Sequence, residues 1–124
     1  MYEYLDSIIQ RDPAARSRLN IIINYPGVKA VAFYKLSHSL WNFNLYLLAR
    51  MVSQFARFIT GVEIHPAAKI GKNLFLDHAN SIVIGESSII GDNCTIYHGV
   101  TLGGLSPSEN SLDQIGSKRH PTIQ

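Results

Sequence analysis

Aliphatic residues recur every six positions through the second half of the chain. They stand at Ile64, Ile70 and Leu76 and, after one longer step, at Ile84, Ile90, Ile96 and Leu102. Small or apolar residues follow four positions later, at Ala68, Leu74, Ser88, Cys94 and Val100. This period fits neither an α-helix, with about 3.6 residues per turn, nor a simple strand, with about two. Short repeats of this kind are typical of parallel β-helices, in which each turn buries its aliphatic corner against the next.

The repeat is irregular in its third unit. This unit is two residues too long, because residues 77–81 (DHANS) stand before Ile82. An irregularity in an otherwise strict repeat often marks a functional or strained site. Asp77 and His78, which lie in this unit, are therefore candidate site residues.

Residues 1–60 show helical patterning. Asp12 with Pro13 predicts an N-cap and first helical residue, opening a helix that ends near Asn24. Two apolar stripes with helical spacing follow, and we expect both to pack in the core. The first stripe comprises Val28, Val31, Ala32, Leu36 and Leu40, and the second Leu45, Leu48, Ala49, Val52, Ala56 and Ile59. Asn42 and Asn44 indicate a turn between them, and Gly61 stands at a plausible C′ position.

The periodicity stops after Gly104. Residues 105–117 are polar and predict an exposed loop, extended for its position. Thr122 and Ile123 could begin another coil, but no further repeat follows. Solenoids normally carry a cap at an open end, so we expect the natural C-terminal portion to lie beyond this sequence. The predicted organisation is a helical unit at 1–61 and a β-helical unit at 62–124.

Composition excludes several classes of protein. The net charge of the 124 residues is only +2, so nothing suggests a nucleic-acid footprint. Cys94 is the single cysteine, which precludes an intrachain disulfide and fits a reducing compartment. The N-terminal MYEYLD lacks the features of a secretory signal, and no apolar run approaches the roughly 18 residues of a membrane span. We expect a cytoplasmic protein without membrane contact.

Six stretches together resemble the serine acetyltransferase family of left-handed β-helix acyltransferases. They are DPAARS (12–17), YPGVKAVAFYKLSHSLW (25–41), EIHPAAKIG (63–71), LDHANSIVIGES (76–87), GDNCTIYHGVTLGG (91–104) and KRHPTI (118–123). The resemblance spans nearly the whole chain. It implies an α+β fold, with an N-terminal α-helical region followed by a left-handed parallel β-helix.

The resemblance also implies a reaction and partners. Family members transfer acetyl from acetyl-CoA to the hydroxyl of L-serine, which gives O-acetyl-L-serine and CoA at the first step of cysteine biosynthesis from serine. Acetyl-CoA is the co-substrate, and no metal is expected. The family forms homotrimers, often dimers of trimers, with active sites between subunits. A C-terminal tail that binds O-acetylserine sulfhydrylase and mediates cysteine feedback follows the last coils in the family, and this sequence ends before it.

Two residues match the family's catalytic pair. His78 matches the general base, and imidazole suits that role because its pKa lies near physiological pH. Glu63 matches the acid that orients this histidine, a position often occupied by aspartate. Read alone, His78 could simply cap an irregular coil, and Glu63 could be a solvated side chain.

Six further residues match the family's substrate contacts. Asp12 and Asp77 match residues that hold the serine ammonium group, although helix capping would also explain Asp12. Arg119 and His120 match residues that hold the serine carboxylate, for which a guanidinium offers a planar fork. Gly103 and Gly104 match the pair beside which the pantetheine arm of acetyl-CoA passes, where glycine permits close backbone approach.

Three alternatives remain open at this point. A β-helical carbonic anhydrase would use His65, His78 and His98 as zinc ligands, but it would leave the DPA and RHP motifs without a purpose. A hexapeptide acetyltransferase could act on another acceptor, such as a sugar. An inactive fragment could take part only in assembly with full-length subunits.

Overall fold

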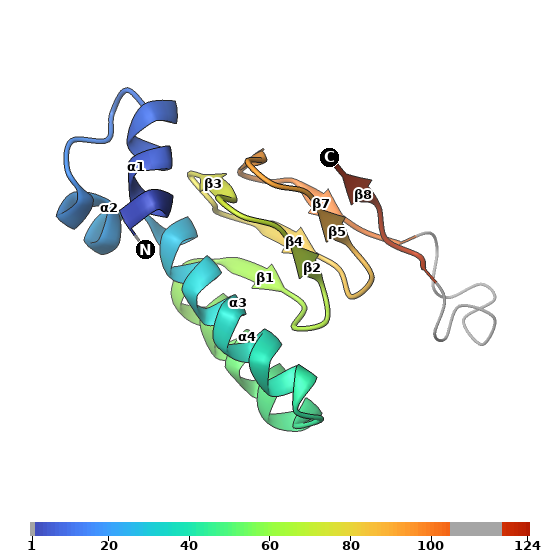
Figure 1. Ribbon diagram of the computed structural model, residues 1–124. Coiled ribbons are helices and arrows are strands. Elements are labelled where there is room, and N and C mark those ends of the chain that lie inside the picture. The colour runs from blue at the N-terminus through green and yellow to red at the C-terminus, as the bar shows by residue number, and fades with distance from the viewer. Residues whose placement is uncertain (1, 105–117) are drawn as a thin grey trace.

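The structure is a computed structural model that describes residues 2–104 and 118–124. The extended loop predicted at 105–117 lies outside the described residues. Four helices form the N-terminal half: α1 (Tyr2–Arg11), α2 (Arg18–Asn24), α3 (Pro26–Asn42) and α4 (Tyr46–Thr60). Figure 1 shows α3 and α4 as a long antiparallel pair beside the strands, with α1 and α2 near β3. No described helix is long and apolar enough to cross a membrane.

The prediction of a helix opening at Asp12 is wrong. Residues 12–17 are not helical, and α2 begins at Arg18. Ser17 caps α2 instead, because its side chain accepts a hydrogen bond from the backbone N–H of Asn20 at 3.1 Å. Asp12 folds back on its own loop, accepting a 2.9 Å hydrogen bond from the N–H of Ala14. Its carboxylate is thereby placed in the loop that follows α1 rather than at the start of a helix.

The predicted turn and cap around α4 are confirmed. Asn44 lies between α3 and α4 with a φ of 64°, a conformation that asparagine tolerates better than most residues. Gly61 ends α4 in the left-handed region, with a φ of 76°. The chain then enters the first strand without further linker.

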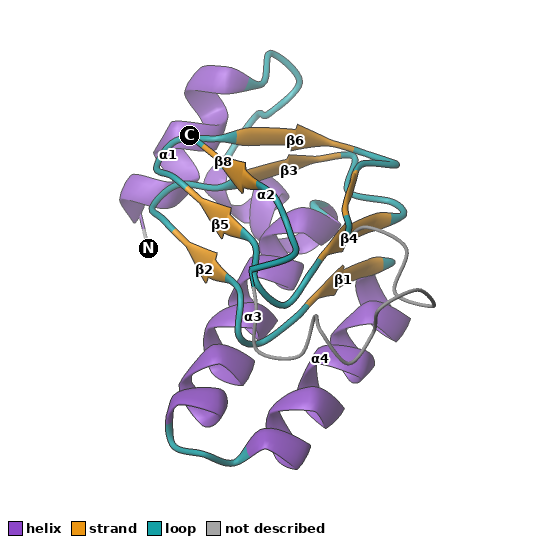
Figure 2. Cartoon of the chain, turned by 90° about the vertical axis from the view of Figure 1, so that its right-hand side faces the viewer, coloured by secondary structure: helices purple, strands orange, loops and turns teal. Residues whose placement is uncertain are grey.

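The second half of the chain is a three-sided parallel coil. Successive strands join three different sheets, ordered β1-β4-β7, β2-β5-β8 and β3-β6, and every pairing is parallel. The sheets lie on three sides of the coil in Figure 2. The strands are β1 (Val62–Ile64), β2 (Lys69–Ile70), β3 (Phe75–Asp77), β4 (Ile82–Ile84), β5 (Ile89–Ile90), β6 (Thr95–Tyr97), β7 (Thr101–Leu102) and β8 (Thr122–Ile123).

Strand register confirms the irregular third unit. Val62 pairs with Ile82, 20 residues later, whereas Val83 pairs with Thr101, 18 residues later. The extra residues of the first turn therefore form the corner between β3 and β4. Ile89 pairs with Thr122, so the coil resumes at β8 after the long segment that follows β7.

The aliphatic positions of the repeat form the core, as the period predicts. Ile64, Leu76, Ile84, Ile90, Ile96 and Leu102 are all at most 6% exposed. The same cluster includes Ala30, Val31 and Tyr34 of α3, so helix and coil share one core. Gly27 lets α3 approach β3 closely, because a Cβ there would lie 2.3 Å from the carbonyl oxygen of Leu76.

The prediction that the helical stripes are core positions is only half right. Small residues fill the buried face of α4, at Ala49, Ser53, Ala56 and Thr60, because α4 packs closely against α3 and β1. Larger apolar residues elsewhere on α4, in the turn before it and on α3 are exposed within a single chain. The exposed set comprises Leu36, Phe43, Leu45, Tyr46, Leu47, Leu48, Met51, Phe55, Phe58 and Ile59.

Candidate functional site

The corner between β3 and β4 is strained. His78, Ala79 and Ser81 have φ values of 59°, 65° and 62°, in a region that costs a non-glycine residue about 1–3 kcal/mol. Neighbouring backbone holds the corner in place: the N–H of Ser81 donates to the carbonyl of Gly61 at 3.0 Å. The buried Ala79 anchors the inside of the corner. This geometry turns the side chain of His78 outward, where it is 72% exposed.

His78 borders a pocket of about 450 Å³ that we name the first pocket. Its walls come from the loop before α2, from the junction of α2 and α3, and from the end of β3. The lining residues are Asp12, Ala14, Asn24, Tyr25, Pro26, Leu76, Asp77 and His78. The structure thus brings together three residues that the sequence singled out, although Asp12 and Asp77 are far apart in the chain.

Asp12 is held as an anion in the first pocket. Its Oδ2 accepts a 2.6 Å hydrogen bond from the hydroxyl of Tyr25, and its Oδ1 accepts one from the N–H of Ala14 at 2.9 Å. The bond from Tyr25, followed by the bond from Ala14, holds the pKa of Asp12 below its ordinary value. His78 contributes in the same direction through its charge.

Two side chains adjoin the imidazole of His78. Its Nε2 lies 3.8 Å from Oδ1 of Asp77. The ring of His98 meets it edge-on, with centroids 5.5 Å apart. The His78 ring therefore sits beside one carboxylate, on a corner with open access.

A second pocket of about 300 Å³ holds most of the remaining predicted residues. It is lined by Arg50, Glu63, His65, Val83, Ile84, Gly85, Glu86, Leu102, Gly103, Arg119 and His120. Within the described residues, none lines both pockets. The predicted ammonium-binding carboxylates and the predicted carboxylate-binding cations are therefore separated within one chain.

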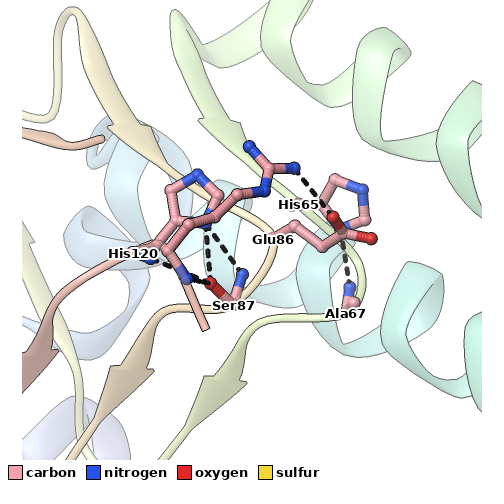
Figure 3. Close-up of polar contacts among 6 residues, drawn as sticks. His65, Ala67, Glu86, Ser87 and His120 are labelled. Atoms are coloured by element: carbon pink, nitrogen blue, oxygen red, sulfur yellow. Dashed lines mark hydrogen bonds and ion pairs between the residues drawn. The ribbon is translucent and has the colours of Figure 1, made fainter. Parts of the chain in front are cut away.

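Ser87 organises the cationic end of the second pocket. Its Oγ accepts hydrogen bonds from the backbone N–H groups of Arg119 and His120, both at 2.9 Å. Its own N–H donates to Nδ1 of His120 at 3.1 Å, as Figure 3 shows. The guanidinium of Arg119 pairs with Glu86 at 3.0 Å. These contacts tie β8 and the segment before it to the turn after β4.

Glycine is required where the imidazole of His120 lies. A Cβ at Gly85 would come within 2.0 Å of Cδ2 of His120, so only glycine leaves room for the ring. Burial, then the charge of Arg119, lowers the pKa of His120. This histidine is therefore biased towards its neutral form.

His65 is a neutral histidine in the same pocket. Its Nδ1 accepts a 3.0 Å hydrogen bond from the N–H of Ala67, which leaves Nε2 to carry the proton. Burial, and then the charge of Arg50, lowers the pKa of His65 to about 4. Figure 3 shows His65 beside Glu86 in this region.

Glu63 contacts residues of α4. Its Oε1 accepts a 3.2 Å hydrogen bond from Nε2 of Gln54 and lies 3.7 Å from Nη1 of Arg57. Within the described residues, no hydrogen bond or ion pair joins Glu63 to His78. The side chain is 29% exposed and faces the second pocket.

The predicted glycine pair lies at the edge of the second pocket. Gly103 lines it, and a Cβ at Gly104 would come 3.3 Å from the carbonyl oxygen of Arg119. Glycine at these two positions permits close approach of a ligand to the backbone. Over residues 2–104 and 118–124, no three His, Cys, Asp or Glu side chains gather as a metal site would require.

Three residues that shape the pockets escaped the sequence analysis. Tyr25 binds Asp12, Ser87 binds Arg119 and His120, and Gly85 makes room for His120. Ser87 and Gly85 stand in the stretch IVIGES, where the glycine reads equally well as part of the repeat. Tyr25 reads as part of a helix break. Their contacts span more than ten residues of sequence, so local pattern carried no signal for them.

Comparisons of the sequence and of the structure with known proteins find the same kind of protein. No family model matches the chain. The chain is 50% identical over 119 residues to serine acetyltransferase of Helicobacter pylori, an alignment covering 96% of this chain and 66% of the relative. It is 46% identical over 121 residues to serine acetyltransferase of Bacillus pumilus, covering 98% of this chain and 52% of the relative. The chain thus spans about half to two thirds of the length of these curated relatives.

Solved structures agree. Soybean serine acetyltransferase complexed with serine superposes with a TM-score of 0.85 at 37% identity, covering 95% of this chain and 46% of that one. A serine acetyltransferase in complex with cysteine reaches 0.88 at 35% identity, covering 98% and 44%. A complex with CoA reaches 0.85 at 35% identity, covering 97% and 46%.

Proposed function

The chain belongs to the serine acetyltransferase family, and from this premise we propose that it transfers acetyl from acetyl-CoA to the hydroxyl of L-serine. The products are O-acetyl-L-serine and CoA, at the entry to cysteine biosynthesis. Structures of relatives complexed with serine and with CoA support these two substrates.

One observation carries the proposal. The first pocket gathers an exposed imidazole, His78, with two carboxylates, Asp12 and Asp77, beside a corner that the backbone holds under strain. Carboxylates attract an ammonium group, and an imidazole accepts a hydroxyl proton near neutral pH. L-serine carries both groups on adjacent carbons, which suits a pocket of this composition.

The proposed reaction needs a single base. His78 takes the proton of the serine hydroxyl while the hydroxyl oxygen attacks the thioester carbon of acetyl-CoA. The tetrahedral intermediate collapses, the carbon–sulfur bond breaks, and the imidazolium returns its proton to the departing thiolate. Asp77, 3.8 Å from Nε2 of His78, stabilises the imidazolium that forms between these steps. Glu63 does not contact His78 within one chain, so we propose that it orients His78 of a neighbouring subunit.

The second pocket supplies the opposite charge. We assign the substrate carboxylate to Arg119 and His120, whose positions Ser87 holds. Because the two pockets are separate within one chain, the second pocket of a neighbouring copy completes the first. The edge at Gly103 and Gly104 receives the pantetheine arm in this arrangement.

The hexapeptide pattern supports a left-handed coil.

The exposed face of the helices supports assembly of several copies. Large apolar side chains cover the outer face of α3 and α4, with Leu47 at 77% and Phe58 at 88% exposure. A surface of this kind is typical of a protein interface. We propose that a second copy of the chain covers it within a homotrimer or a dimer of trimers.

An assay of thiol release tests the proposed reaction. Thiol release from acetyl-CoA is measured with L-serine for the wild-type chain and for His78→Ala, with His38→Ala as the matched control. His38 binds the carbonyl of Pro66 through Nδ1 at 2.7 Å and lies outside both pockets. We expect serine-dependent release that falls about 100-fold or more in His78→Ala only, because removal of a general base costs about 10²–10⁴ in rate.

Two results would contradict the proposal. Release with a sugar acceptor but not with L-serine would indicate a different acceptor. No release from a folded, correctly assembled wild-type chain would show that residues 1–124 are not sufficient for the reaction. Size-exclusion chromatography of the same samples establishes folding and assembly.

A further inference from the structure

Tyr25 is held rigidly at the junction of α2 and α3. Its backbone is extended, with φ −101° and ψ 102°, and Pro26 follows at the start of α3. A residue before proline is restricted to such conformations. Its ring stacks on the buried Phe75 of β3, with centroids 6.4 Å apart and planes at 21°. The phenol is therefore fixed both through its backbone and through its ring.

The hydroxyl of Tyr25 determines how the Asp12 carboxylate lies. It donates to Oδ2 at 2.6 Å, while the N–H of Ala14 donates to Oδ1 at 2.9 Å. One protein donor on each oxygen fixes the plane of the carboxylate. A carboxylate oxygen accepts more than one hydrogen bond, so both oxygens can still bind a further donor from the first pocket.

The charge states of Tyr25 and Asp12 also suit the binding of a cation by the Asp12 carboxylate. Burial, then the hydrogen bond to Asp12, raises the pKa of Tyr25 to about 12, with Asp77 acting in the same direction. Tyr25 is thus a neutral donor at physiological pH and adds no charge that would compete with a cation. Asp12 remains an anion because Tyr25, Ala14 and His78 all lower its pKa.

We propose that Tyr25 is a positioning residue for the amino group of the substrate. Its hydroxyl holds the Asp12 carboxylate in the orientation that receives an α-ammonium group in the first pocket. The inference rests on the proposed function and deepens it, because it adds to substrate recognition a residue that touches Asp12 rather than the reacting atoms. Tyr25 lies between α2 and α3, whereas Asp12 lies in the loop between α1 and α2.

A conservative pair of variants tests the role. Tyr25→Phe removes the hydroxyl and keeps the ring on Phe75. Tyr4→Phe is the matched control, because the Tyr4 hydroxyl donates to the carbonyl of Leu74 at 2.7 Å and is not part of the first pocket. We expect Tyr25→Phe to raise KM for L-serine about tenfold, with kcat and KM for acetyl-CoA changed less than about threefold. Tyr4→Phe should leave KM for L-serine unchanged and lower only thermal stability.

A second readout does not depend on turnover. Carbon-13 NMR titration of the side-chain carboxyls, with Asp12→Asn to assign the signal, measures the pKa of Asp12 in each variant. Loss of the hydroxyl removes the leading cause of the lowered pKa, so the pKa of Asp12 should rise in Tyr25→Phe and stay unchanged in Tyr4→Phe.

The outcomes separate this inference from the proposed function. A KM for L-serine within about twofold of wild type in Tyr25→Phe, while Asp12→Asn raises it strongly, would overturn the positioning role and leave the proposed function standing. An unchanged pKa of Asp12 would overturn it as well. If wild type shows no serine-dependent release, the proposed function fails for this chain, and the NMR titration with calorimetric L-serine binding decides the role of Tyr25.

Discussion

At the scale of single residues, the position of His120 depends on the absence of a side chain at Gly85. The imidazole fills the space where a Cβ would stand, and Ser87 binds its Nδ1. Glycines occur at several equivalent positions of the repeat. At Gly85 the absence of a side chain makes room for His120, whereas at Gly91 glycine only follows the repeat. Gly91 also follows a buried isoleucine, but a Cβ there would meet Cα of Gln124 at an ordinary 3.4 Å.

The first prediction compares these two glycines. Gly85→Ala should displace the His120 ring, raise KM for L-serine by about tenfold or more and leave the fold intact, because the proposed carboxylate contact is lost. Gly91→Ala should change KM by less than about twofold. Steady-state kinetics at varied L-serine, with circular dichroism as the check on folding, measures both. Equal KM values in the two variants would show that His120 does not contact the substrate.

The second prediction concerns acid stability. The pKa of His65 is lowered to about 4 in the folded chain, so between that pH and the ordinary histidine value the unfolded chain binds more protons. The free energy of unfolding therefore falls as the pH is lowered from 7 to 5, by at most about 1.4 kcal/mol per pH unit from this residue. The groups that act on His65 are Arg50, Glu63, Glu86 and His120.

Urea unfolding at pH 7 and pH 5 measures this effect. His65→Asn should show a weaker dependence on pH than wild type, and His98→Asn, at an exposed position, should match wild type. Identical pH dependence in wild type and His65→Asn would mean that His65 is not held neutral.

At the scale of elements, Arg11 ties α1 to two turns of the coil. Its Nη1 donates to the carbonyls of Asn93 and Cys94 and to Oγ1 of Thr95, at 3.1–3.3 Å, and its Nη2 donates to the carbonyl of Asn73 at 2.5 Å. Asn73 and Asn93 take the same left-handed conformation in successive turns and bind each other through their side chains at 3.0 Å. A helix that is distant in sequence therefore closes one corner of the coil.

The third prediction tests this tie. Arg11→Gln should lower the free energy of unfolding by about 1–3 kcal/mol, because several hydrogen bonds from a charged donor are lost together. Arg18→Gln is the control, since the ion pair of Arg18 with Asp6 is exposed to solvent and contributes little to stability. Denaturant unfolding compares the two, and equal losses would show that the contacts of Arg11 are as weak as a surface ion pair.

At the scale of the whole molecule, the exposed apolar face of α3 and α4 is the surface through which we propose that copies assemble. The fourth prediction is that Phe58→Glu weakens self-association about ten- to a hundredfold, because burial of a large apolar side chain contributes about 1.5–3 kcal/mol. Leu19→Glu places the same charge on α2 at a site that is 66% exposed and should have little effect. Analytical ultracentrifugation measures both, and unchanged association in Phe58→Glu would place the interface elsewhere.

The coil could be predicted from the sequence because each repeat buries the same side of its own six residues. Ile64, Ile84 and Leu102 stand one above another in one sheet, so period alone identifies the core and the extra residues at 77–81. Histidine at such an irregularity, flanked by aspartate, also indicated a candidate site at this corner.

Only the tertiary structure decided how the predicted residues combine. The packing of α3 on β3 across Gly27 brings Asp12 and Tyr25 to Asp77 and His78, and no local rule encodes that meeting of distant segments. Within one chain, Arg119 and His120 lie in the other pocket, and large apolar residues of α4 stay exposed. A sequence specifies which side chains prefer burial, but which face of a helix is buried depends on the elements that pack against it. The sequence by itself therefore determined the repeat, its interruption and the types of candidate side chain, whereas the fold decided which of these side chains share a pocket.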